Sequence, residues 1–200
     1  NMLKNNILND ILMAISNDKE WLLGGLLLMG VLFLFVYLGR QRSSSNPLTE
    51  LMEAISVDSL SNIVLFDDMN EEIHIEHLLL TARGLVILDV KTSSGTVFGT
   101  NQMNEWTILT GHERVSINNP QEALYNRLMA LRLLVRDVPI YGHVLFIQGV
   151  DFSKSRADDV ILPEELRKLY KKPGKLELER VMEAFNPYWQ TICSSARSLL

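Results

Sequence analysis

The chain has 200 residues, of which 47% are hydrophobic and 22% charged, the composition of a globular domain of ordinary size with an appendage. Its net charge is −5, and residues 46–200 alone carry 15 basic against 21 acidic side chains, a net charge of −6. This balance excludes the broad basic surface of a strong duplex binder, so a nucleic-acid function needs a local basic patch. The single cysteine, Cys193, excludes an intramolecular disulfide, and a reducing compartment is the simpler location.

Residues 21–38 form an uncharged apolar segment with Trp21 and Tyr37 near its two ends. At 1.5 Å per residue a helix of this length spans about 27 Å, close to the roughly 30 Å hydrocarbon core of a bilayer. The aromatic side chains suit the two membrane interfaces. The segment therefore predicts one transmembrane helix, and the alternative, a buried core helix, is disfavoured by the unbroken lack of charge.

Residues 39–47 read as a polar, serine-rich linker that ends in Pro47. They contain no small-x-small cleavage site, and no clearly basic region precedes the apolar segment, so we expect an uncleaved anchor and not a signal peptide. Arg40 and Arg42 follow the anchor directly. The positive-inside rule then places the domain behind it on the cytoplasmic side of the inner (cytoplasmic) membrane.

Residues 1–20 repeat apolar side chains at helical spacing, with Leu3, Ile7, Ile11 and Ile15 on one face and polar side chains on the other. This pattern predicts a short amphipathic helix. Such a helix lies on a membrane surface or pairs with a copy of itself, which would make the chain a homo-oligomer. The sequence leaves both alternatives open.

Residues 48–200 form the predicted folded domain. Its strands come first, followed by a helix, a further strand and terminal helices, which indicates an α/β fold with a mixed central sheet flanked by helices and not an alternating doubly wound sheet. In chain order the expected elements are a helix at 48–55, strands at 62–66, 73–80, 85–91, 96–98 and 106–109, a helix from Asn119-Pro120 to about 136, a strand at 140–147, and helices at 163–170 and 176–185, with more helix possible after Pro187.

Residues 73–91 predict a β-hairpin in which chemistry-bearing side chains gather. If the turn holds an even number of residues, Glu76 faces Asp89 and His74 faces Lys91. Because side chains alternate along a strand, all four then share one face of the sheet. A three-residue turn would shift the register by one and break this arrangement.

Two carboxylates directly opposite each other repel, unless a cation lies between them. Mg²⁺ and Mn²⁺ prefer carboxylate oxygens, so Glu76 and Asp89 are candidate metal ligands. Lys91, two residues beyond Asp89, could stabilise the negative charge that develops on a phosphate. The alternative is a solvated strand end at which Lys91 neutralises Asp89. A metal pair of His74 and His77 is disfavoured, because residues three apart on a strand point to opposite faces.

A series of short motifs begins in the hairpin and continues beyond it in this order: Ile75-Glu76-His77, Gly84, Asp89-Val90-Lys91, Gly95, Val97 and Gly99, Trp106, and Asn119-Pro120. Together these motifs resemble the nuclease-related domain family, NERD, over roughly residues 48–150. The resemblance implies a PD-(D/E)xK nuclease-like fold, as in restriction endonucleases, and metal-dependent hydrolysis of phosphodiester bonds with Glu76, Asp89 and Lys91 as catalytic residues. Members of this family with a transmembrane anchor also occur.

The chain departs from the family pattern at the acids and at the helix. Glu76 stands where the family has Asp, and Asp89 where it usually has Glu. Gln121 lies two residues before the position of the family's helix glutamine, and Glu50 and Glu53 are the carboxylates that might replace an absent upstream Gly-Glu motif. These departures favour an alternative in which the domain is catalytically inactive and binds nucleic acid or a protein at the membrane.

Two acid-free stretches could contact phosphate groups. Residues 123–136 contain Arg127 and Arg132, and residues 167–175 contain Lys171 and Lys172. The second stretch could also contact anionic lipid. The alternative is that both are solvated faces balanced by nearby acids. Phosphate-binding Walker loops, paired Cys-x-x-Cys motifs and Gly-x-Ser-x-Gly motifs are absent from the sequence.

Overall fold

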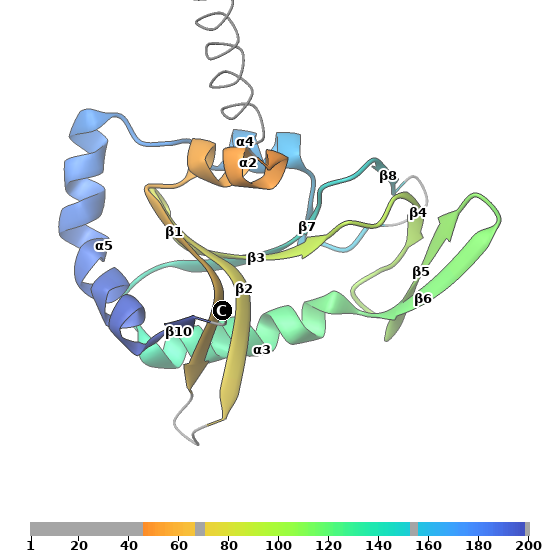
Figure 1. Cartoon of the computed structure of the whole chain (residues 1–200), viewed down its shortest axis with the longest axis horizontal. Helices are drawn as coiled ribbons and strands as arrows, with labels where there is room; N and C mark the ends of the chain where they lie inside the picture. Colours follow the sequence, from red (N-terminus) through yellow and green to blue (C-terminus); the bar gives the residue numbers. More distant parts are fainter. Residues whose placement is uncertain (1–45, 67–70, 153–155, 199–200) are drawn as a thin grey trace, which may run out of the picture. The chain divides into compact units, whose positions relative to one another are not determined.

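The computed structural model describes residues 46–66, 71–152 and 156–198 (Figure 1). The chain divides into two units, Asn1–Asn46 and Pro47–Leu200, and the fold described below is that of the second. The predicted amphipathic segment 1–20, the predicted transmembrane helix 21–38 and nearly all of the linker 39–47 lie outside the described residues. Among the residues that are described, no helix is both long enough and apolar enough to cross a membrane.

The second unit contains helices and strands in mixed order, and its strands form two sheets. In chain order its described elements are α2 (Pro47–Ile55), β1 (Asp58–Phe66), β2 (Glu72–Thr81), β3 (Gly84–Lys91), β4 (Gly95–Phe98), β5 (Glu105–Thr110), β6 (Glu113–Asn118), α3 (Pro120–Leu134), β7 (Ile140–Phe146), β8 (Val150–Asp151), β9 (Val160–Ile161), α4 (Pro163–Leu169), α5 (Lys175–Ser195) and β10 (Arg197–Ser198).

The larger sheet has the strand order β10-β1-β2-β3-β7-β9. Strands β1, β2 and β3 are antiparallel neighbours, whereas β7 runs parallel to β3 and β9 runs parallel to β7. Helices α2 and α4 lie above this sheet in Figure 1, and α3 lies below it. The prediction of a mixed central sheet flanked by helices is therefore confirmed.

Strands β2 and β3 are buried on both faces, which explains their nearly continuous apolar sequence. Leu78 and Ile87 belong to the apolar cluster that includes α3. Leu79, Val86 and Leu88 belong to the cluster beneath α2 and α4. Because side chains alternate, the odd-numbered positions of β3 are turned toward α3, which brings its two charged residues to that side.

The hairpin between β2 and β3 has the predicted register. Leu78 pairs with Ile87 and Leu80 pairs with Leu85, so the turn consists of the two residues at 82 and 83. A two-residue turn is the shortest common hairpin connection and keeps the even-numbered register on which the predicted site depends. This register sets where Glu76 on β2 lies relative to Asp89 on β3.

The pairing of β2 with β3 ends sooner than the sequence suggests. Its last pair is His77 with Leu88, and His74 pairs with Val64 on β1. The expectation that His74 lies opposite Lys91 is therefore wrong. Neighbouring strands are rotated relative to one another, and here β2 separates from β3 while it remains paired with β1.

A second sheet, in the order β6-β5-β4-β8, continues from the first. The parallel pair β3 and β7 leads into the parallel pair β4 and β8. Two backbone hydrogen bonds close the junction: Ile147 N donates to Lys91 O at 3.1 Å, and Gly95 N donates to Gly149 O at 3.2 Å. Lys91 is thus fixed where the two sheets meet.

The described structure also contains elements that the sequence does not predict. Strand β6 was not predicted, and it is exposed along almost its whole length. Helix α5 continues through Pro187, as the sequence left possible, although proline removes a helical hydrogen bond. Burial of Trp189 and Ile192, and a 2.9 Å bond from the Trp189 indole to Asp58, hold the last turns of α5 against the core.

Candidate functional site

Asp89 is a buried carboxylate with one open acceptor. It lies near the end of β3, and only 2% of its surface is exposed. Its Oδ2 accepts a hydrogen bond of 2.6 Å from Arg127 Nη1, whereas Oδ1 is buried without a hydrogen-bond partner among the described residues. Burial raises the pKa of Asp89, although the positive charges of Arg127 and Lys91 act in the opposite direction. A cation at Oδ1 would satisfy an atom that is otherwise costly to bury.

Glu76 is half-buried at the point where β2 separates from β3. Val90 N, which lies beyond the last paired residues of the two strands, donates a 2.9 Å hydrogen bond to Glu76 Oε2. The negative charge of Glu76 contributes to the raised pKa of Asp89, but Glu76 is not among the residues that line the pocket beside Asp89. A carboxylate has about four acceptor positions, and the bond to Val90 occupies only one of them.

Lys91 and Asp89 line a pocket of about 280 Å³ at the junction of the two sheets. Arg127 and Ala123 of α3 line it from the opposite side. The remaining lining residues come from the segment after β3, the end of β6, the helix cap and the first residue of α3: Ser93, Ile117, Asn118, Asn119 and Pro120. The pocket therefore offers two basic side chains beside a buried carboxylate, a combination suited to a phosphate group.

Arg127 is held by two contacts on the face of α3 that is turned to the sheet. Its Nε donates to His74 O at 2.5 Å and its Nη1 donates to Asp89. The side chain was expected only as a phosphate contact, and its pairing with Asp89 is an additional role. The sequence does place Ala123, Arg127 and Ala130 on one helical face, but it does not say which strand this face meets.

Helix α3 begins at the pocket because of its capping residues. Asn119 Oδ1 accepts a 3.0 Å bond from Gln121 N, and Pro120 occupies the first turn, where its missing N–H costs nothing. Capping fixes the first turn beside the end of β6. The predicted Asn-Pro signal for the helix start is thereby confirmed.

Glu50 and Glu53 are not brought to this pocket. They lie on α2, whose buried residues pack on the sheet face opposite to α3. Asp89 instead contacts α3. The structure therefore does not place either glutamate where it could replace a missing carboxylate of the candidate site.

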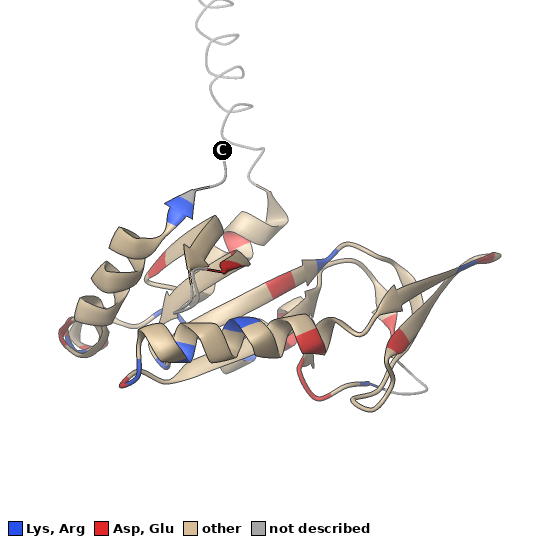
Figure 2. Cartoon of the chain, turned by 90° about the horizontal axis from the view of Figure 1, so that it is seen from below, with Lys and Arg blue, Asp and Glu red and all other residues tan. Residues whose placement is uncertain are grey.

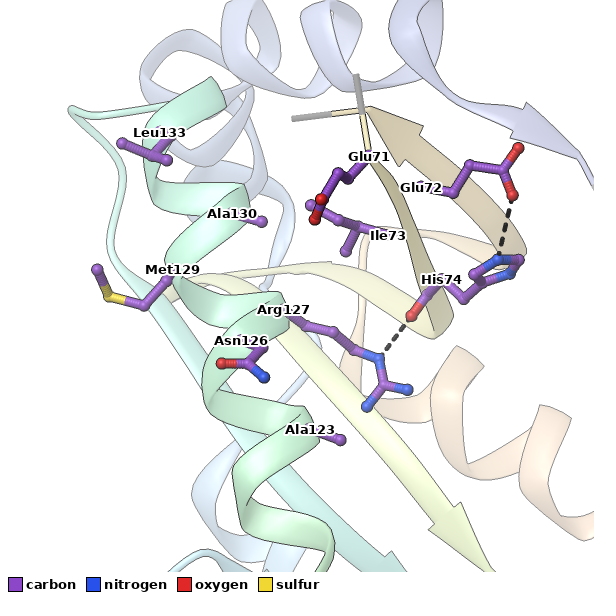
Figure 3. A pocket seen from close by; sticks show the side chains of 10 residues that line it. All are labelled: Glu71, Glu72, Ile73, His74, Ala123, Asn126, Arg127, Met129, Ala130 and Leu133. Atoms are coloured by element: carbon purple, nitrogen blue, oxygen red, sulfur yellow. Dashed lines mark hydrogen bonds and ion pairs between the residues drawn. The ribbon is translucent and has the colours of Figure 1, made fainter. Parts of the chain in front are cut away.

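Gln121 and His74 also lie apart from the pocket. Only 2% of Gln121 is exposed, and its Nε2 lies 2.8 Å from Asp159 Oδ2 and 3.3 Å from Asn101 Oδ1, so it joins α3 to two loops. His74 Nε2 lies 3.5 Å from Glu72 Oε2, and Figure 3 shows both side chains pointing away from α3. Neither is positioned as an accessory residue of the site.

The other predicted phosphate contacts are dispersed. Arg132 lines a different pocket with Tyr125 and Tyr141. Lys172 Nζ donates to Glu53 O at 3.3 Å, which places Lys171 and Lys172 beside α2. Figure 2 shows basic residues scattered singly over the elements, with no continuous basic stripe in that view. Arg127 is thus the predicted phosphate contact that the structure brings to Asp89.

A divalent cation could be held here by two carboxylates alone. No group of three or more His, Cys, Asp or Glu side chains suited to a metal occurs in the described part of the chain. Mg²⁺ is commonly held by one or two carboxylates and completes its coordination with water and phosphate oxygens. Asp89, with its unpartnered Oδ1, and Glu76 supply that minimal set.

The remaining motif residues build the second sheet. Trp106 is fully buried, and its indole N–H donates to Thr100 O at 3.2 Å. Gly99 lies against the ring so closely that an added Cβ would come within 2.3 Å of it. Gly95 has a φ of +112°, which favours glycine, and an added Cβ would meet Leu109 O at 2.1 Å. These residues act on the fold and carry no chemistry of their own.

Comparison with known proteins gives one match. The family model of NERD, the nuclease-related domain, matches residues 42–147. No curated protein and no solved structure matches the chain significantly. The matched region contains both candidate carboxylates, Lys91 and Arg127, and it covers more than half of the 200 residues. The chain therefore belongs to the nuclease-related domain family.

Proposed function

We propose that this domain hydrolyses phosphodiester bonds with Mg²⁺ or Mn²⁺ held by Glu76 and Asp89. The observation that carries the proposal is the unpartnered Oδ1 of Asp89, buried beside a pocket lined by Lys91 and Arg127. A buried acceptor without a partner is rare in native proteins, and a cation would satisfy it. Membership of a nuclease-related family is consistent with this chemistry.

Each residue has a distinct task in the proposed reaction. Asp89 Oδ1 and Glu76 hold the cation, and the bond from Val90 N orients the Glu76 carboxylate. The bound ion would polarise a phosphate oxygen and favour ionisation of the attacking water. Lys91 lines the same pocket, and its ammonium group would stabilise the charge that develops on the phosphate.

Arg127 does not need to move for a cation to bind. Its contact is to Oδ2 of Asp89, and the free acceptor is Oδ1. The guanidinium keeps the carboxylate in one orientation and adds a second positive charge to the pocket. This local patch supplies the attraction for phosphate that the net charge of −5 does not provide.

The test is Lys91→Ala in the full chain, purified in a mild detergent. We expect Mn²⁺-dependent cleavage of labelled DNA and RNA oligonucleotides to fall by about 10²–10³, the usual effect of losing one transition-state donor. Mn²⁺ affinity, measured by calorimetry, is expected to change little, because the ammonium group is not a ligand. Lys175→Ala, at an exposed position at the start of α5, is the matched control.

The Asp89–Arg127 ion pair favours a second candidate function, an inactive domain that binds nucleic acid or a protein at the membrane. In that case the guanidinium is the permanent counter-charge of Asp89. Millimolar Mn²⁺ would then give no binding heat that depends on Glu76, and no cleavage would be lost with Lys91. Binding of oligonucleotides without cleavage would support this alternative.

The uncharged segment at residues 21–38 supports the further proposal that the domain is tethered to the inner membrane and faces the cytoplasm. The tether would keep the site within reach of nucleic acid near the bilayer. Fractionation of cells that make the chain with and without residues 21–38 tests this part. Recovery of the full chain in the soluble fraction would contradict it.

A further inference from the structure

A groove of about 530 Å³ adjoins the candidate site along α3. Ala123 and Arg127 line both this groove and the pocket that holds Asp89 and Lys91, so the two cavities meet at the arginine. In Figure 3 Ala123, Arg127 and Ala130 point from α3 toward β2. The small alanine side chains leave space on either side of Arg127.

The groove changes character along its length. Arg127 presents its guanidinium beside Ala123, and farther along α3 Ile73 of β2 and Ala130 line the groove (Figure 3). Figure 3 shows Glu71 and Ile73 pointing toward α3 from the start of β2, so an acidic side chain stands at the far end. The sequence of charges is therefore basic, apolar and then acidic.

This order of charges suits a single nucleotide bound in one orientation. A phosphate group is attracted by Arg127 and Lys91, whereas the flat and largely uncharged base suits the apolar lining. A carboxylate at the far end disfavours a further phosphate there. A base can enter the groove only if it is unstacked and unpaired, which is the case in single strands and at frayed ends.

We propose that the groove between α3 and the start of β2 is a nucleoside subsite that takes one unpaired nucleotide beside the phosphate to be cleaved. This proposal rests on the proposed function, since it names the substrate class of the same site. It assigns single-stranded nucleic acid as the substrate.

The test fills the groove with Ala130→Trp in the full chain. We expect polarisation measurements with a labelled single-stranded oligonucleotide in EDTA to show binding at least about tenfold weaker. With Mn²⁺, the ratio of oligonucleotide cleavage to hydrolysis of bis(p-nitrophenyl) phosphate, a diester without a nucleoside, is expected to fall by a similar factor. The matching duplex is expected to bind the unaltered chain at least about tenfold more weakly than the single strand.

Ala184→Trp, at an exposed position of α5, is the matched control and is expected to change neither measurement. If Ala130→Trp disturbs folding, Asn126→Glu takes its place, because Asn126 is exposed and lines the groove, so the added carboxylate repels the nucleotide. The subsite would be overturned if neither substitution weakened single-strand binding, or if the unaltered chain bound the duplex more tightly than the single strand. Binding that depends on Ala130 without hydrolysis of either diester would overturn only the proposed function.

Discussion

We expect Asp89→Asn to lower phosphodiester hydrolysis by a factor of at least about 10³ without destabilising the domain. A bound divalent ion contributes several kcal/mol to transition-state stabilisation, and each 1.36 kcal/mol is a factor of ten in rate. Asparagine keeps the size of the side chain and still accepts a hydrogen bond from Arg127. It lacks the negative charge that a cation requires.

The effect on stability follows from the pKa of Asp89, which burial raises. A carboxyl group whose pKa is higher in the folded than in the unfolded state binds its proton more tightly when folded. Its contribution to stability is complete below the unfolded pKa and is lost as the pH rises through the folded pKa. Asparagine does not ionise, so Asp89→Asn does not lose stability in this way. The unfolding free energy of the variant is therefore expected to rise relative to that of the unaltered chain as the pH rises from 3 to 7.

The measurement combines hydrolysis of a single-stranded oligonucleotide at pH 7 with urea unfolding across that pH range. Asp137→Asn, at an exposed position outside the site, is the matched control and should leave both unchanged. A loss of stability of about 3–5 kcal/mol in Asp89→Asn would contradict the prediction. That cost is typical of breaking a buried ion pair, and it would identify the Asp89–Arg127 pair as a structural element.

The hairpin that carries the acids was predictable because its signals are local. Strands β2 and β3 are apolar along most of their length and are joined by two residues, which fixes the register from Leu78 with Ile87 to Leu80 with Leu85. The end of the pairing was not predictable. It depends on the twist of β2 toward β1, which arises from tertiary packing and leaves no mark in the order of the residues.

For the helices too, local features were predictable from the sequence and packing partners were not. The start of α3 at Pro120 follows from its cap, and the face with Arg127 follows from helical spacing. That this face meets Asp89, and that α2 packs on the opposite side with Glu50 and Glu53, depends on the order of strands and helices in three dimensions. Strand β6 was missed although Val115 and Ile117 alternate with polar residues, because two apolar residues are too short a pattern to distinguish a strand from a loop.

The second large effect concerns Trp106 and Gly99, whose contact holds the second sheet together. Trp106→Ala removes a fully buried indole and is expected to cost about 3–5 kcal/mol of unfolding free energy. Gly99→Ala alone is expected to cost about 1–3 kcal/mol, because its Cβ would come within 2.3 Å of the ring. Both costs arise from one contact, so they should not add.

In the double variant the methyl group that Gly99→Ala introduces occupies space that the indole has left. We therefore expect the double variant to be more stable than the sum of the single effects predicts, by about 1 kcal/mol or more. Urea unfolding followed by circular dichroism measures the cycle. Gly174→Ala combined with Trp106→Ala is the control, because a Cβ at Gly174 meets nothing within 4 Å and should add independently. If the effects in the Gly99 cycle are additive, β5 must shift to make room for the methyl group. The indole ring would then not be the contact that fixes the position of β4.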